Sequence, residues 1–360
     1  MENKSVELYT SILGANTVAH YNIDGKKICP YFIAPWWEEP WLDIGVDLLN
    51  VARGSFFCMP FGGDDTGYNG KVEPVHGSCA SENWTMISAN DKNEEKTMYI
   101  EFSKGRGSIE KELKLIKGQT VFYERNTIKN YSGKYPVAFH PMIKLPDTSG
   151  TAHLSIGFVK DCFSAPIQFE NPENGGYSLF KNNQQIKDIR KVKTVFGDTE
   201  DLTKQPIRIG FEDIILFFND TNKQIGFTAI TFKEEGFVYF QLKNPRKLKN
   251  TMLWFSNGGR HYAPWNGRCK SVLGIEDSIS FFHYGAKASA EPNFLNEMGY
   301  ETSILFKEEK EYNFELISGI AKVPSGFQAV ESIETKEDGI TIIGTDSSKI
   351  GVLLDLGFIK

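Results

Sequence analysis

The sequence predicts an all-β protein. Short apolar or alternating runs recur along its 360 residues, while long stretches with helical periodicity are almost absent. Aromatic residues make up 13% of the chain, including 27 Phe and 14 Tyr, and such side chains favour strands over helices. Many short strands separated by turn residues are typical of a sandwich or a barrel.

The expected strands are spread along the whole chain. The clearest is 120–129, TVFYERNTIK, in which successive side chains alternate as in a half-buried strand. Residues 219–223 have the composition of a hairpin turn. Helical patterns occur only at 288–298 and in parts of 1–12. Further strands are expected at 97–102, 112–116, 214–218, 225–232, 236–242, 302–306 and 311–317.

Two segments stand apart from this pattern. Residues 170–193 are polar and rich in Gly and Asn, so we expect a surface excursion there. Residues 331–360 alternate charged residues with short β-like runs, and we expect a final hairpin that closes a sheet edge. Because no linker is apparent, the sequence predicts a single domain over 1–360.

Composition narrows the classes of function. The net charge is −6 with both signs interspersed, and the lack of a long basic run argues against a nucleic-acid partner. The N-terminus is polar, and no segment approaches the roughly 20 apolar residues that span a bilayer. We therefore expect a cytoplasmic protein without a membrane partner. Five scattered cysteines without a CxxC pair indicate free thiols.

Several kinds of catalytic site are disfavoured by missing motifs. The chain has no HExxH, no GxSxG and no phosphate-binding loop, so we expect neither a metal site nor a bound cofactor. Glu276 and Asp277 are adjacent and point to opposite faces of a strand. They are therefore not the facing carboxylates of a glycosidase, which lie roughly 5 to 10 Å apart.

Residues 253–277, LWFSNGGRHYAPWNGRCKSVLGIED, form the richest segment of the chain. Its Gly and Pro residues indicate a strand, a long irregular loop and a second strand that carries Glu276. Loops rich in polar and aromatic side chains at the mouth of a β scaffold often hold small polar ligands. The candidate ligand-binding residues of the loop are Arg260, His261, Trp265 and Asn266.

Other candidate residues lie earlier in the chain. Trp36 follows a proline, Arg53 begins RGSFFCMPFGG, and His76 lies in PVHGSCASENW. His140 precedes a proline in YPVAFHPMIKL, which favours an extended backbone. Three other histidines have contexts that suggest no role: His20, His153 and His283.

This inventory of His, Glu, Arg, Asn and Trp suits a neutral polyhydroxylated ligand. Aromatic faces cover the C–H face of a sugar, while Asn, Arg and His satisfy its hydroxyl groups. One His and one Glu are also the smallest set that moves a proton on and off a hemiacetal.

His76 in VHGSCASENW, His140 in FHPMIKLP and Glu276 in VLGIED resemble, in order and spacing, the landmarks of the galactose mutarotase, or aldose 1-epimerase, family. The segments RGSFFCMPFGG and WFSNGGRHYAPWNGR resemble an aldose-epimerase-like branch of it. This resemblance, from Arg53 to Glu276, implies a β-supersandwich of large twisted antiparallel sheets.

The resemblance also implies roles. Glu276 takes the proton from the anomeric hydroxyl, and His140 donates one to the ring oxygen. His76 and Arg53 bind sugar hydroxyls or assist. The sugar-binding Asp of the family corresponds to Asp213.

The neighbouring Glu212 is a rival for the role of Asp213, because the chain reads Glu-Asp-Ile where the family often has Asp-His. The function expected first is therefore an aldose 1-epimerase acting on a small sugar, as a monomer or a homodimer. The alternatives are a non-catalytic carbohydrate-binding protein and a hexose-phosphate epimerase in which Arg53, Arg260 and Arg268 clamp the phosphate. A glycan lyase or hydrolase ranks lower, since no second facing carboxylate is evident.

Overall fold

A computed structural model describes residues 1–39, 46–63, 67–92, 94–105 and 107–360. Within these residues the strands gather mainly in two large antiparallel sheets. The nine-stranded sheet has the order β16-β12-β18-β19-β23-β8-β7-β6-β5. Its strands are β5 (Thr85–Lys92), β6 (Glu95–Lys104), β7 (Gly107–Ile116), β8 (Val121–Lys129), β12 (Ala152–Ile156), β16 (Lys204–Gln205), β18 (Gly226–Phe232), β19 (Phe237–Lys243) and β23 (Tyr312–Lys322).

The seven-stranded sheet has the order β13-β17-β20-β21-β10-β4, and β11 also pairs with β21. Its strands are β4 (Phe57–Cys58), β10 (Val137–Phe139), β11 (Met142–Lys144), β13 (Val159–Ser164), β17 (Phe211–Asn219), β20 (Asn250–Asn257) and β21 (Val272–Ile279).

Smaller elements surround the two sheets. The helices are α1 (Asp47–Val51), α2 (Gly285–Ala290) and α3 (Phe294–Glu297), with single 3-10 turns η1 (Ser78–Ala80), η2 (Pro172–Asn174) and η3 (Leu356–Ile359). Two short sheets have three strands each. One is formed by β1 (Val6–Thr10), β2 (Thr17–Ile23) and β3 (Lys26–Ile28), and the other by β24 (Val330–Lys336), β25 (Gly339–Gly344) and β26 (Lys349–Leu353). Two strand pairs complete the set: β14 (Val192–Lys193) with β15 (Thr199–Glu200), and β9 (Gly133–Tyr135) with β22 (Ile304–Phe306).

No helix in the described residues is long and apolar enough to cross a bilayer.

The largest apolar cluster joins the two large sheets. Ile109 and Phe122 of the nine-stranded sheet belong to it together with Leu253 and Ile275 of the seven-stranded sheet. Side chains alternate between the faces of a strand, so the residues next to these point the other way. On β20 this places Met252 and Trp254 on the outer face, in a second apolar cluster that α1 covers.

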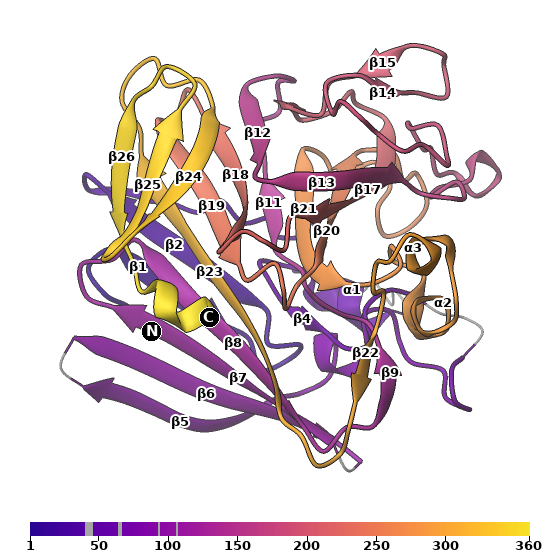
Figure 1. Ribbon diagram of the computed structural model, residues 1–360, viewed down its shortest axis with the longest axis horizontal. Coiled ribbons are helices and arrows are strands. Elements are labelled where there is room, and N and C mark those ends of the chain that lie inside the picture. Colours follow the sequence, from indigo (N-terminus) through magenta and orange to yellow (C-terminus); the bar gives the residue numbers. More distant parts are fainter. Residues whose placement is uncertain (40–45, 64–66, 93, 106) are drawn as a thin grey trace.

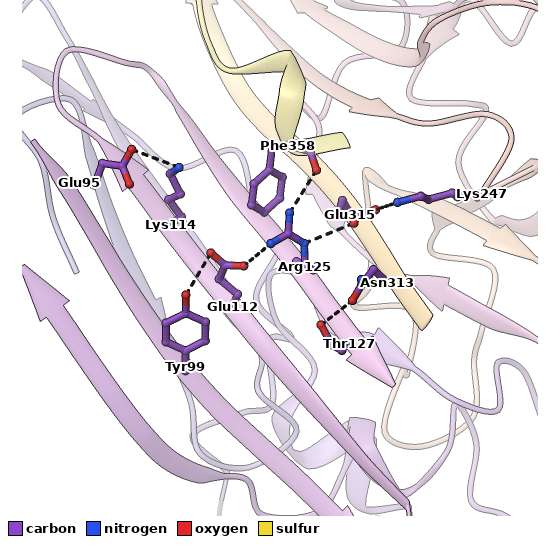
Figure 2. Close-up of polar contacts among 10 residues, drawn as sticks. All are labelled: Glu95, Tyr99, Glu112, Lys114, Arg125, Thr127, Lys247, Asn313, Glu315 and Phe358. Carbon is purple, nitrogen blue, oxygen red and sulfur yellow. Dashed lines mark hydrogen bonds and ion pairs between the residues drawn. The ribbon is translucent and has the colours of Figure 1, made fainter. Parts of the chain in front are cut away.

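The C-terminal strands cover a face of the nine-stranded sheet instead of extending an edge. Ile333 and Ile340 pack on Val238 and Ile317 in a third apolar cluster, beside β18 and β19 (Figure 1). The expected final hairpin at 331–360 is thus a three-stranded sheet, and the expected edge closure is wrong. After it, η3 brings Phe358 to the guanidinium group of Arg125 on the same face (Figure 2).

The structure confirms the expected strands as parts of β6, β7, β8, β17, β18, β19, β22 and β23. The helical expectation for 1–12 is wrong, because 6–10 form β1 and pair with β2. The helical pattern at 288–298 corresponds to the end of α2 and to α3, with a break between them. Residues 219–223 are not a hairpin turn, because β17 and β18 lie in different sheets.

A buried ion pair lies in the core-facing side of the nine-stranded sheet. Lys111 Nζ is 2.9 Å from Glu124 Oε1, and both side chains are fully buried. Lys111 also donates a hydrogen bond to the carbonyl oxygen of Ala15 at 3.1 Å, which ties the N-terminal segment to β7. Asn126 Nδ2 donates to the same carboxylate oxygen of Glu124 at 3.0 Å.

We expect Lys111→Met to lower the free energy of unfolding by about 3–5 kcal/mol, because it leaves the Glu124 charge buried and unpaired. Adding Glu124→Gln removes that charge and should restore much of the loss. Lys114→Met is the matched control: its Nζ lies 3.3 Å from a half-exposed Glu95 carboxylate, so about 0–1 kcal/mol is expected. Urea unfolding measures all three; a double variant no more stable than Lys111→Met contradicts the prediction.

Candidate functional site

The register of β21 brings the two residues expected to react together. β10 and β11 pair with the same edge of β21 in one continuous antiparallel register. His140 lies in the short break between β10 and β11, and in this register it falls opposite Glu276. His140 Nε2 is 3.3 Å from Glu276 Oε1. The structure thus joins residues that are far apart in the sequence.

The side chains of His140 and Glu276 are buried, and each has an atom without a hydrogen-bond partner among the described residues. His140 is 5% exposed and Glu276 is 1% exposed. Among the described residues, His140 Nδ1 and Glu276 Oε2 have no hydrogen-bond partner. The His140 ring stacks on Phe56 with centroids 4.5 Å apart, and Met252 is the cross-strand neighbour of Glu276. Buried polar atoms are normally satisfied, so these two are available to a ligand.

Burial also sets the charge of the pair. Loss of hydration lowers the pKa of His140 to about 3 and raises the pKa of Glu276 well above its ordinary value. Both shifts favour the uncharged form. Burial therefore opposes a charge on either member of the ligand-free pair.

The pair faces a cavity of about 250 Å³ on the outer side of the seven-stranded sheet. Aromatic walls are provided by Trp254 and Trp265, and α1 provides an aliphatic wall. Six of the eighteen described lining residues are polar: His76, His140, Arg260, Tyr262, Glu276 and His283. The expected site residues His76, Arg260 and Trp265 thus share one cavity with the pair.

His76 lies edge-on to His140, with ring centroids 4.9 Å apart. Its Nδ1 accepts a hydrogen bond from the Gly62 N–H at 3.3 Å, which leaves Nε2 for a ligand. The backbone of His76 is left-handed, with φ of 64°, just before Gly77. Burial, with the neighbouring His140 adding to it, holds the pKa of His76 well below its ordinary value, so this imidazole is neutral.

His283 is a cavity residue that the sequence did not indicate. Burial, and after it the charge of Arg260, lowers the pKa of His283 to about 4. Its Nδ1 has no partner among the described residues, and its ring lies edge-on to Phe169. The one available signal was its aromatic context, FFHYG, which is of the kind that singled out His140.

Arg260 is held on the cavity wall by a carboxylate that was also missed. Its Nε donates to Glu170 Oε1 at 2.5 Å, and its guanidinium carbon lies 4.5 Å from the Trp265 ring centroid. The Tyr262 hydroxyl donates to the same carboxylate at 3.1 and 3.2 Å. Glu170 is 8% exposed, so the start of the expected surface excursion is in fact buried beside the cavity.

Glu212 and Asp213 point to opposite faces of β17. Glu212 accepts hydrogen bonds from Trp254 Nε1 at 3.1 Å and Ser256 Oγ at 2.8 Å, behind the cavity wall. Burial raises the pKa of Glu212 to about 8. Asp213 accepts two backbone N–H groups of 179–180 on the other face. Contrary to the expectation, the structure does not bring Asp213 to the cavity.

Trp36 supports the cavity from behind. Its ring meets that of Trp265 edge-on, with centroids 5.0 Å apart. Its Nε1 donates to the Leu49 carbonyl oxygen at 2.8 Å, which fastens α1 to this wall. Trp36 does not line the cavity itself, so the expected sugar contact becomes a supporting one.

Three other expected residues lie away from the cavity lining. The Arg53 guanidinium carbon lies 4.8 Å from the Trp37 ring centroid, and its Nε donates to a backbone carbonyl. His261 is exposed and meets Tyr177 edge-on. Asn266 is exposed in the turn of the loop. None of these three residues is among the described residues that line the cavity.

The three arginines expected to clamp a phosphate do not converge. Arg268 Nη1 donates to Glu39 Oε1 at 2.6 Å, whereas Arg260 is bound to Glu170. Among the three, only Arg260 lines the cavity. Within the described part of the chain, no group of three or more His, Cys, Asp or Glu side chains is arranged to hold a metal ion.

Comparison with solved structures identifies the fold. No family model and no curated protein matches this sequence. Solved structures match over 89–90% of the chain, each with 10% sequence identity. One is a protein provisionally assigned as an aldose 1-epimerase from Escherichia coli K12, with a TM-score of 0.58 and 98% of that chain covered. The others are a galactose mutarotase related enzyme from Lactobacillus acidophilus (TM-score 0.56, 98% of that chain covered) and a galactose mutarotase-like protein from Lactobacillus casei (TM-score 0.55, 99% of that chain covered). The chain therefore has a galactose mutarotase-like β-sandwich fold, which confirms the predicted fold class.

Gly274 leaves the space that the Glu276 carboxylate occupies. A Cβ at this position would lie 2.8 Å from Glu276 Oε1 and 3.1 Å from Trp254 Cβ. We expect Gly274→Ala to lower the free energy of unfolding by about 1–3 kcal/mol through overpacking. Gly351→Ala is the control, because its Cβ would meet only Lys336 Nζ at 3.5 Å. Equal denaturation midpoints for the two variants would refute the prediction.

Proposed function

We propose that this chain is a carbohydrate-active protein, an aldose 1-epimerase that interconverts sugar anomers with Glu276 and His140 as the reacting pair. The observation that carries the proposal is a buried carboxyl–imidazole pair, 3.3 Å apart, that faces a cavity with aromatic walls. In our proposal this pair holds one proton. We further propose that 1–360 form one domain, since shared apolar clusters join both large sheets and the C-terminal sheet.

Anomer exchange needs one proton removed and one proton supplied. The anomeric hydroxyl loses its proton, the ring oxygen gains one, and the bond between the anomeric carbon and the ring oxygen breaks. The aldehyde then rotates, and the reverse steps close the ring. A pair that carries a single proton can perform both transfers without any net exchange with solvent.

In our proposal Glu276 is the base and His140 is the acid. Sugar hydroxyls that donate to the Glu276 carboxylate favour its ionised form, so its proton moves to His140 across the 3.3 Å contact. Glu276 then accepts the anomeric proton, and His140 protonates the ring oxygen. The two unpartnered atoms of the pair are the positions from which a bound sugar would be contacted.

The remaining polar groups of the cavity are assigned to binding. The Trp254 and Trp265 rings cover the C–H face of the sugar. His76 presents its Nε2 to a hydroxyl, because its Nδ1 is already engaged. Arg260 and His283 replace His261, Asn266, Asp213 and Arg53 as the hydroxyl-binding groups in this proposal.

A non-catalytic carbohydrate-binding protein is the second candidate function. The observation that favours it is the burial of Glu276, which raises the pKa of this carboxyl and so favours its uncharged form. A pair that stays neutral when sugar is bound would hold the ligand without opening its ring. The hexose-phosphate alternative has less support, because its three arginines do not converge.

Replacing Glu276 with Gln tests the proposed reaction. Loss of the base should slow enzyme-dependent anomer exchange by about 10²-fold or more. Saturation-exchange NMR on a panel of aldoses measures the rate. Glu331→Gln, at an exposed position far from the cavity, should leave the rate unchanged. A wild-type protein that binds sugars without accelerating exchange of any of them is a binding protein.

The pH profile tests the single-proton pair. As pH falls through the His140 pKa of about 3, His140 gains a second proton and the pair can no longer accept one. As pH rises through the elevated Glu276 pKa, the pair loses the proton it must donate. We expect kcat/KM, corrected for solvent-catalysed exchange, to be flat between these limits. A decline below about pH 6.5, the ordinary range of histidine, would argue against a neutral pair.

A further inference from the structure

Trp254 lies near two polar groups of the cavity, the His140–Glu276 pair and Arg260 with Tyr262. Its ring centroid is 6.1 Å from that of His140 and 5.7 Å from the Arg260 guanidinium carbon. A ligand that covers the Trp254 ring is therefore within reach of both groups.

The supply of hydrogen-bonding groups is small for a fully hydroxylated sugar. Each hydroxyl brings one donor and two acceptor positions. In our proposal Glu276 and His140 are committed to the reacting atoms, and the Tyr262 hydroxyl and Arg260 Nε already serve Glu170. That leaves His76, His283 and the Nη groups of Arg260 for the hydroxyl groups of the sugar. Among the described lining residues there is no Asn, Gln, Asp, Ser or Thr.

The rest of the lining is apolar, and one wall of it is aliphatic. The other twelve described lining residues are apolar, and Leu48 and Leu49 of α1 stand among them. The sheet contributes Met142, Ile214 and Met252. A hydroxyl pressed against such a surface loses its water without gaining a partner, whereas a methyl group gains from burial.

We infer that the cavity takes a deoxy sugar, a pyranose in which a hydroxyl is missing from the part that faces the aliphatic wall. A 6-deoxyhexose, whose methyl group replaces a hydroxymethyl group, is the form that fits this description. The inference rests on the proposed function, because it takes Glu276 and His140 to engage the anomeric end of the ring.

Matched sugar pairs test this inference. D-galactose is compared with 6-deoxy-D-galactose, D-glucose with 6-deoxy-D-glucose, and L-mannose with 6-deoxy-L-mannose. Anomer exchange is followed by NMR, and binding is followed separately by calorimetry. In at least one pair the deoxy sugar should have the higher kcat/KM by about 10- to 100-fold, the range that a single hydroxyl is worth against an apolar pocket.

A substitution in the aliphatic wall tests whether α1 is the source of the preference for deoxy sugars. Leu49→Asn places an amide on the half-buried cavity side of α1 and should reduce the deoxy preference at least several-fold. Leu305→Asn, at an exposed leucine of β22, is the matched control and should leave the ratio unchanged. If Leu49→Asn does not fold, the inference is decided by the wild-type protein alone, from the ratio of kcat/KM for each deoxy sugar to kcat/KM for its hydroxylated partner.

The outcomes separate this inference from the proposed function. Accelerated exchange with equal or lower rates for every deoxy sugar overturns the inference and leaves the epimerase proposal standing. Tighter binding of a deoxy sugar without any accelerated exchange supports the inference and overturns the epimerase proposal. Absence of both binding and exchange for all six sugars overturns both.

Discussion

The antiparallel register that holds β21 between β20 and the β10–β11 edge determines which side chains reach the cavity. In this register Glu276 points outward beside His140, and its neighbour Asp277 points into the space between the sheets. There Lys243 Nζ lies 2.8 Å from Asp277, so the inner carboxylate is neutralised. A shift of one residue would exchange the two environments. The same strand thus carries one carboxylate that stabilises the core and one that remains available for a ligand.

Burial gives the cavity its electrostatic character. Loss of hydration lowers the pKa values of His76, His140 and His283 and raises the pKa of Glu276, so burial favours the uncharged form of all four groups. Arg260 retains its charge, because although burial alone opposes that charge, the carboxyl groups around it raise its pKa. The result is a cavity in which burial opposes charge and the retained cation, Arg260, is compensated by Glu170. Such a cavity disfavours the binding of additional charge.

The elements that the sequence predicted correctly are those with a local cause. Short runs of apolar and aromatic residues form β8, β20 and β21. These strands are buried on both faces, so the expectation of a half-buried strand at 120–129 is wrong. The expectations that were wrong depended on distant partners. Residues 219–223 look like a hairpin turn, yet the chain crosses there from one large sheet to the other. Residues 331–360 have the pattern of an edge hairpin, yet their apolar side chains pack on a face of the nine-stranded sheet.

The sequence by itself determined an all-β fold class, because strand periodicity is a local feature of the chain, and the order of His76, His140 and Glu276 singled out His140 and Glu276 as a candidate pair. Which residues line the cavity was decided only by the tertiary structure. The direction of a side chain on a strand depends on register, which placed Glu212 toward the cavity wall and Asp213 away from it. Burial depends on segments far away in the chain, which is why His283 lines the cavity and Glu170 holds Arg260 at its wall, whereas the exposed loop residues His261 and Asn266 do not line it.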